Sequence, residues 1–316
     1  RTCDLLRVEQ LLSQLSYPPK EMTILSKLIT NNKKWHINCC RRSMIFQIIR
    51  TGIDATGRDL AVISNNLANT STNGFKRSEA QFEDIYQSHH NNSTEVARGM
   101  GVKTIKPRQN FSQGSLQQTN GSLDLAIMGE GFFVLGSPVG RANADERLKY
   151  TRDGSFQLDR LGNLVNTEGL PLLGEGQQKI NIPFFKAVNT TDQNGNTTSE
   201  NSMLTEIAVK DDGRIEATYG LDTTELAGKI ILADFVNEHG LQNIGNAKFQ
   251  ETKESGLPTF GSPKEKTIGK IQPGFLEKSN TDITDELVTM LRTQHAFNGC
   301  SKILQSELDV TKRLSN

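Results

Sequence analysis

The sequence predicts an α+β protein in which N- and C-terminal helices pair as a coiled-coil-like domain and enclose a central, mostly antiparallel β domain. Two observations predict this fold class. Both ends of the chain carry apolar residues three or four positions apart, in stripes narrow enough to favour a partner helix. The long middle of the chain instead has short apolar runs bounded by Asp-Gly and Gly-Asn turns, which is typical of antiparallel strands.

Residues 1–43 differ from the rest of the chain. They carry one weak helical pattern that Pro18 and Pro19 break, and the organised pattern begins just after Met44. We therefore expect an extension that is either disordered or not native to the protein. The alternative is a basic amphipathic arm around Trp35 that contacts a membrane or a partner.

Residues 44–68 form the first predicted helix. Gly52 and Gly57 within it each cost roughly 1 kcal/mol relative to Ala, so this helix needs packing to persist. A connecting segment, residues 69–100, opens with Asn, Ser and Thr side chains that can end a helix, and Gly74 fits a position with positive φ. The predicted N-terminal assembly seam consists of Ile45, Ile49, Ile53, Leu60, Ile63 and Leu67.

Residues 101–256 form the predicted β domain, in which the polar stretch 189–201 is expected to be a mobile loop. Residues 257–279 are the expected linker to a C-terminal helix, residues 280–316, whose start is marked by possible N-caps from Ser279 to Asp282. A soft interruption is expected at Asn298-Gly299. The predicted C-terminal seam consists of Ile283, Leu287, Met290, Phe297, Leu304 and Leu308.

Composition and motifs argue against catalysis. The 316 residues are 35% hydrophobic, and 36 basic residues balance 36 acidic ones, so nucleic acid is not an expected partner. No apolar run reaches the roughly 20 residues that span a bilayer, and direct membrane insertion is not expected. The His and Cys residues lack ligand spacing, and no nucleophile-base pair stands out. We expect no enzyme activity, no metal and no cofactor.

The chain resembles bacterial flagellar rod and hook proteins over about residues 44–316. The N-terminal signature of that family is carried by Asn65, Asn66, Leu67, Ala68, Asn69, Gly74, Phe75 and Lys76. Further matches are Phe82 to Gln87, Leu123 to Ile127, Gly129 to Phe133, Tyr150 to Phe156 and Glu277 to Asn280. The similarity is strongest to the distal rod members, although the stretch from His295 to Cys300 departs from the family pattern.

The resemblance implies a structural subunit of the basal-body distal rod that self-assembles through its terminal helices into a tubular drive shaft transmitting torque to the hook. Implied partners are further copies, proximal rod and hook subunits, the bushing formed by the P and L rings, and the flagellar type III export apparatus. The implied location is the periplasm-spanning rod, reached without a cleaved signal peptide. Alternatives are a hook or proximal-rod paralogue, or a secreted β-rich binding module with helical arms.

Overall fold

The computed structural model describes residues 45–87, 98–136, 148–191, 197–220, 223–265 and 268–315. The expected extension, residues 1–43, lies outside the described residues. The chain forms two compact units. The first contains the described residues up to Gly57, Phe82–Thr104 and the chain from His295 onward, and the second contains Arg58–Gln81 and Ile105–Gln294.

In the first unit, a β-hairpin packs on the N-terminal helix, which covers residues 45–68 of the chain. Strands β2 (Phe82–Gln87) and β3 (Arg98–Thr104) pair antiparallel in this hairpin. Gly101 of β3 has φ +109°, and a Cβ added to it would lie 2.3 Å from the Thr51 hydroxyl of the helix. Only glycine therefore permits this approach. The predicted boundary of the β domain at residue 101 was wrong, because it falls inside β3.

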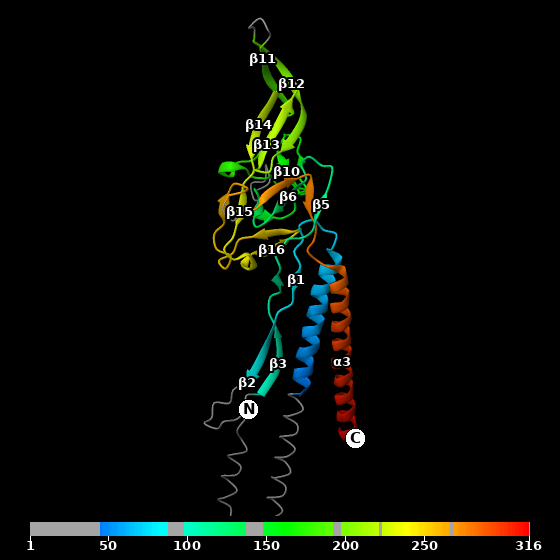
Figure 1. Ribbon diagram of the computed structural model, residues 1–316. Coiled ribbons are helices and arrows are strands. Elements are labelled where there is room, and N and C mark those ends of the chain that lie inside the picture. Colours follow the sequence, from blue (N-terminus) through cyan, green and yellow to red (C-terminus); the bar gives the residue numbers. More distant parts are fainter. Residues whose placement is uncertain are drawn as a thin grey trace, which may run out of the picture. The chain divides into compact units, whose positions relative to one another are not determined.

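The second unit is built around a six-stranded antiparallel sheet (Figure 1). Its strand order is β16 (Gln242–Gly245), β17 (Lys248–Gln250), β8 (Lys149–Thr151), β7 (Phe132–Leu135), β15 (Leu232–Asp234) and β18 (Thr259–Gly261). A four-stranded sheet follows the order β11 (Phe185–Thr191), β12 (Thr197–Val209), β13 (Arg214–Tyr219) and β14 (Thr223–Lys229). The mostly antiparallel β domain between terminal helices is confirmed.

Short strand pairs and two 3-10 helices complete this unit. The pairs are β1 (Ser78–Glu79) with β4 (Arg108–Gln109), β5 (Leu116–Gln118) with β20 (Phe275–Glu277), β6 (Leu125–Met128) with β19 (Lys270–Pro273), and β9 (Gln157–Leu158) with β10 (Leu164–Val165). The 3-10 helices are η1 (Glu175–Gln177) and η2 (Glu238–Gly240). In the pairs β5–β20 and β6–β19, strands from the segment just before α3 pair with strands about 150 residues earlier in the sequence. That segment is therefore part of the β fold.

Two hydrophobic clusters form the core of the second unit. One lies under the four-stranded sheet, where Ile215, Ala217 and Tyr219 alternate along β13 with more exposed residues. The other is aromatic, and Phe132 in it makes edge-on contacts with Phe111, Phe235 and Phe249. Such edge-to-face pairs are a favoured arrangement of buried rings.

Two sequence predictions about irregular segments need correction. Most of the expected loop 189–201 is strand, because β11 continues to Thr191 and β12 begins at Thr197; residues 192–196 lie outside the described residues. The stretch is rich in β-branched Thr, which favours strands and outweighed its polarity. The expected linker 257–279 contains strands β18, β19 and β20.

The C-terminal helix α3 (Ile283–Ser315) confirms the predicted N-cap region. The Asp282 carboxylate accepts hydrogen bonds from the backbone N–H groups of Thr284 at 2.7 Å and Asp285 at 3.4 Å. The expected interruption at Asn298-Gly299 was wrong, since α3 continues through both residues. No helix among the described residues combines the length and apolar character that crossing a bilayer requires.

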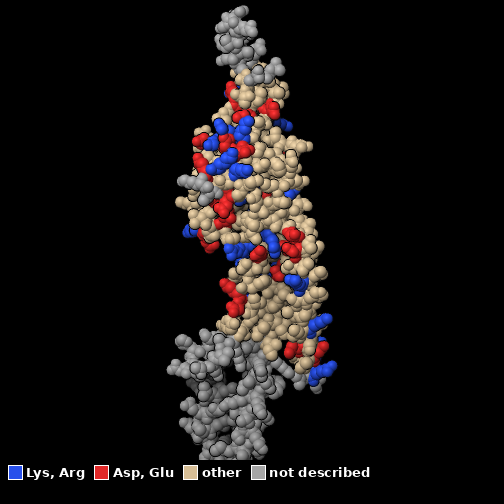
Figure 2. Space-filling model, in the orientation of Figure 1, with Lys and Arg blue, Asp and Glu red and all other residues tan. Residues whose placement is uncertain are grey.

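Charged side chains of both signs are interspersed over the face of the β-rich unit seen in Figure 2. The unit also contains ion pairs at its surface, for example Lys210 with Glu216 at 3.3 Å and Arg214 with Asp212 at 2.6 Å. This mixture agrees with the balanced composition of the chain.

Candidate functional site

The candidate site lies within the second unit, where the segment after the N-terminal helix and the segment before α3 meet the β domain. Gly74 has φ +65°, as the sequence predicted. A Cβ added to Gly74 would lie 2.4 Å from the backbone nitrogen of Asp153. The backbone N–H of Gly74 donates a hydrogen bond to the Glu277 carbonyl at 2.8 Å. Glycine is therefore required here both by backbone conformation and by close approach.

A buried ion pair lies next to this glycine. The Lys76 ammonium is 2.7 Å from Oε1 of Glu277, and the two side chains are 1% and 0% exposed. The ammonium also donates to the Ser112 carbonyl at 2.9 Å, and the Gly114 N–H donates to the same Glu277 oxygen at 2.9 Å. Desolvation lowers the pKa of Lys76, and the charge of Glu277 opposes this shift.

Arg152 adds a second buried cation to Glu277. Its Nη1 lies 3.5 Å from Oε2 of Glu277 and donates to the Gly129 carbonyl at 2.9 Å. The guanidinium also lies over the ring of Phe132, 5.1 Å from the centroid. The arrangement joins three chain segments that are far apart in sequence. We call Lys76, Arg152 and Glu277 the buried ion cluster.

Asn66 joins the end of the N-terminal helix to the following chain and to α3. Its amide donates to the Ser78 carbonyl at 2.8 Å and accepts from the Ser78 N–H at 3.0 Å. The same amide nitrogen donates to Oε1 of buried Glu286 at 3.2 Å, and the Arg77 Nε lies 2.7 Å from that oxygen. Asp59 and Thr293 form a second link between the helices, at 2.8 Å.

Asn280 connects the segment before α3 to two other segments. Its side-chain oxygen accepts from the Arg77 N–H at 2.7 Å, and its amide nitrogen donates to the carbonyls of Asn110 at 2.8 Å and Ser112 at 3.1 Å.

Sequence reasoning missed the roles of Arg152, Glu277 and Glu286. The available signal was weak, because the resemblance covered these positions without assigning them a contact.

The remaining family-motif residues differ in how far their side chains are exposed to solvent. Phe75 is buried, Leu67 and Asn69 are half-buried, and Asn65 and Ala68 are exposed. The Asn69 side chain donates to the Asn65 carbonyl at 2.9 Å, where the helix ends. The motif therefore serves both to end the helix and, through Asn66, Gly74, Phe75 and Lys76, to seat the chain on the β domain.

The predicted seams are only partly buried within one chain. Ile63 is buried; Ile49, Ile53, Leu60, Leu67, Met290, Phe297 and Leu304 are half-buried; Ile45, Ile283, Leu287 and Leu308 are exposed. On α3 the buried positions are instead Glu286, one residue before Leu287 of the expected stripe, and Thr293. The buried face of α3 therefore carries hydrogen-bonding side chains. The spacing of apolar residues in the sequence did not predict this.

Three models of flagellar families match separate parts of the chain. The flagella basal body rod protein model matches residues 47–76, the flagellar hook protein FlgE/F/G D1 domain matches 126–217, and the flagellar basal body rod FlgEFG protein C-terminal model matches 272–316. The flagellar basal-body rod protein FlgG of Buchnera aphidicola subsp. Acyrthosiphon pisum is 38% identical over 280 residues, covering 85% of this chain and 97% of its own. The chain belongs to the flagellar basal-body rod protein family.

Other members of the rod and hook families extend this result. FlgG of Borreliella burgdorferi is 35% identical over 267 residues, covering 81% of this chain and 91% of its own. The flagellar hook protein FlgE of Escherichia coli is 24% identical over 413 residues, covering 86% of this chain and 100% of its own. Identity is higher to the rod proteins. The family is structural, so the protein is not an enzyme.

Proposed function

We propose that this rod-family protein is a subunit of the distal rod, and that its terminal helices pair in a coiled-coil-like manner and assemble with those of neighbouring copies into a tubular shaft. One observation carries the proposal. Two hydrogen bonds, Asp59–Thr293 and Asn66–Glu286, join the two helices within a chain, and large apolar side chains of α3 are left exposed.

The outward apolar stripe on α3 consists of Ile283, Leu287 and Leu291, which are 52%, 44% and 57% exposed. Their four-residue spacing places them on one side of the helix. Fully burying one such side chain contributes about 1.5 to 3 kcal/mol, so the exposed half of these three offers roughly 2 to 5 kcal/mol per copy to a neighbour. A large exposed apolar stripe is a feature of association surfaces.

A shaft that grows at its end needs a heterologous interface, in which one surface of a copy meets a different surface of the next. We further propose that the helical ends are largely disordered in the monomer and fold on assembly, because Gly52 and Gly57 weaken the N-terminal helix and neighbours supply the missing contacts. The expected partners are the proximal rod, the hook, the P and L rings and the type III export apparatus, at the periplasm-spanning rod.

The test changes the stripe and leaves the helix intact. Leu287→Asp with Leu291→Asp should leave the β domain folded and abolish filament formation, measured by sedimentation and negative-stain electron microscopy. Ala296→Asp is the matched control, since Ala296 is exposed on α3 outside the stripe. If the double variant formed filaments as the wild-type protein does, the proposal would be contradicted. Rigid terminal amides in NMR spectra of the monomer would contradict folding on assembly.

A further inference from the structure

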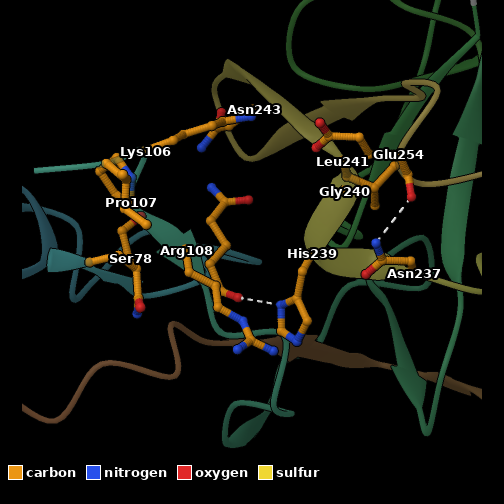
Figure 3. A pocket seen from close by; sticks show the side chains of 13 residues that line it. Ser78, Lys106, Pro107, Arg108, Asn237, His239, Gly240, Leu241, Asn243 and Glu254 are labelled. Atoms are coloured by element: carbon orange, nitrogen blue, oxygen red, sulfur yellow. Dashed lines mark hydrogen bonds between the residues drawn. The ribbon is translucent and has the colours of Figure 1, made fainter. Parts of the chain in front are cut away.

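A groove of about 530 Å³ lies on the second unit, and none of the three residues of the buried ion cluster lines it. Figure 3 shows Lys106, Pro107 and Arg108 on one side of it and His239, Leu241 and Glu254 on the other. Ser78, Gln81, Ile105, Gln109, Asn237, Gly240 and Asn243 complete the lining. The groove thus combines apolar, polar and charged surface, as protein interfaces do.

The groove has an excess of basic groups. Within the described part of the chain, neither Lys106 nor Arg108 forms an ion pair, and Glu254 is the one carboxylate of the lining. His239 adds a ring whose Nδ1 lies 2.9 Å from the Gln109 carbonyl. Unpaired cations on an open surface attract an acidic partner and select against a basic one.

A free sheet edge borders the same groove. Strand β16, whose Asn243 lines the groove, is the last strand of the six-stranded sheet, and among the described residues it pairs with β17 alone. All four of its residues are exposed. An exposed edge strand presents unpaired N–H and C=O groups to which another extended segment can add.

Strand β2 has the complementary properties. Within the part of the chain that the structure describes, β2 pairs with β3 alone and its other edge is free. It carries Glu83 and Asp84 beside the exposed side chains of Phe82, Ile85 and Tyr86. Its six residues exceed the four of β16, so it can pair along the whole of that edge. A two-stranded hairpin is marginal alone and gains from a third strand.

We propose that β2 of a second copy adds to the free edge of β16 in this groove. Because Glu83 and Asp84 are consecutive on the strand and point to opposite faces of it, one of the two carboxylates faces Lys106 and Arg108. The interface is heterologous because the acidic strand and the basic groove are different surfaces of the chain, and such an interface propagates along an open helix when its rotation does not close a ring. The inference rests on the proposed function, since it requires copies that lie side by side in a polymer.

Charge reversal tests this contact on the full chain. Glu83→Lys with Asp84→Lys should raise the critical concentration for filament formation about tenfold or more, and Lys106→Glu with Arg108→Glu should do the same. The four changes together should restore assembly to within about threefold of wild type. As a matched control, Glu206→Lys and Glu216→Lys reverse two charges on β12 and β13, and should not rescue the Lys106/Arg108 variant.

Cross-linking provides a second readout that does not depend on charge. With the native cysteines replaced by Ser, Tyr86→Cys with Asn243→Cys should give disulfide-linked ladders in filaments and none in dilute monomer. Monomer-only cross-links would overturn the proposal by placing β2 on its own groove. Failure of both the rescue and the ladder, while the Leu287/Leu291 variant still abolishes filaments, would overturn this contact and leave the proposed function standing.

Discussion

Replacing Glu277 by Gln should destabilise the protein by about 3 to 5 kcal/mol, the usual cost of breaking a buried ion pair by neutralising one partner. Gln has nearly the same shape, so the change removes charge without opening a cavity. It leaves the buried ammonium of Lys76 and guanidinium of Arg152 without a counterion, and weakens the acceptor that Lys76 and the Gly114 N–H share.

Urea unfolding of the monomer, followed by far-UV circular dichroism at pH 7, measures this loss. With a slope of about 2 to 3 kcal/mol per molar urea, the midpoint should fall by roughly 1 to 2.5 M. The control is Glu225→Gln, which removes the carboxylate of an exposed pair with Lys186 and should leave the midpoint nearly unchanged. A loss below about 1 kcal/mol for Glu277→Gln would refute the reasoning that Glu277 compensates two buried cations.

Three further predictions address other positions. In filaments, Gly101→Ala should destabilise the packing of the hairpin on the N-terminal helix and speed amide exchange in β3, whereas Gly99→Ala, with open space around its Cβ, should not. In filaments, where the helical ends are folded, Gly52→Cys should form a disulfide with Cys300 under mild oxidation, since a Cβ at Gly52 lies 3.6 Å from that sulfur; a free thiol after oxidation would contradict the packing. Burial raises the pKa of Glu238 above its ordinary 4.5, so its contribution to stability is present below pH 4.5 and is lost as pH rises through the raised value. Glu238→Gln should therefore raise the urea midpoint at pH 7 and not at pH 4.

Much of the fold could be predicted from local patterns. The N-cap at Asp282 and the positive φ of Gly74 follow from side-chain and backbone preferences of single residues, and both are confirmed. The antiparallel strands follow from Asp-Gly turns such as the one at Gly213, whose φ is +81°. The Thr-rich ends of β11 and β12 were mistaken for a loop, because polarity and β-branching conflict there.

The inner face of the helices could not be predicted in the same way. Helical spacing places Leu287 and Glu286 next to each other on α3, and apolar character favours Leu287 as the buried residue. The buried residue is Glu286, because Asn66 and Arg77 supply its hydrogen bond and countercharge from a segment more than two hundred positions away. Such a partner is set by tertiary structure and leaves no periodic signal in the sequence.

The buried ion cluster contributes more to fixing the geometry of the chain than to its net stability, which is what a structural subunit requires. Replacing a buried ionic group by well-packed apolar residues is often neutral or stabilising, so the cluster adds little net energy to the fold. What Lys76, Arg152 and Glu277 do provide is a geometry that few alternative packings can satisfy, because any displaced charge would be buried without a partner. If the terminal helices acquire their order only among neighbouring copies, the direction in which they leave the β domain must already be fixed. The ion cluster and the Asn66 and Asn280 amides lie at both departure points, and Lys76, Asn66 and Asn280 each donate to a backbone carbonyl, that of Ser112, Ser78 and Asn110 respectively.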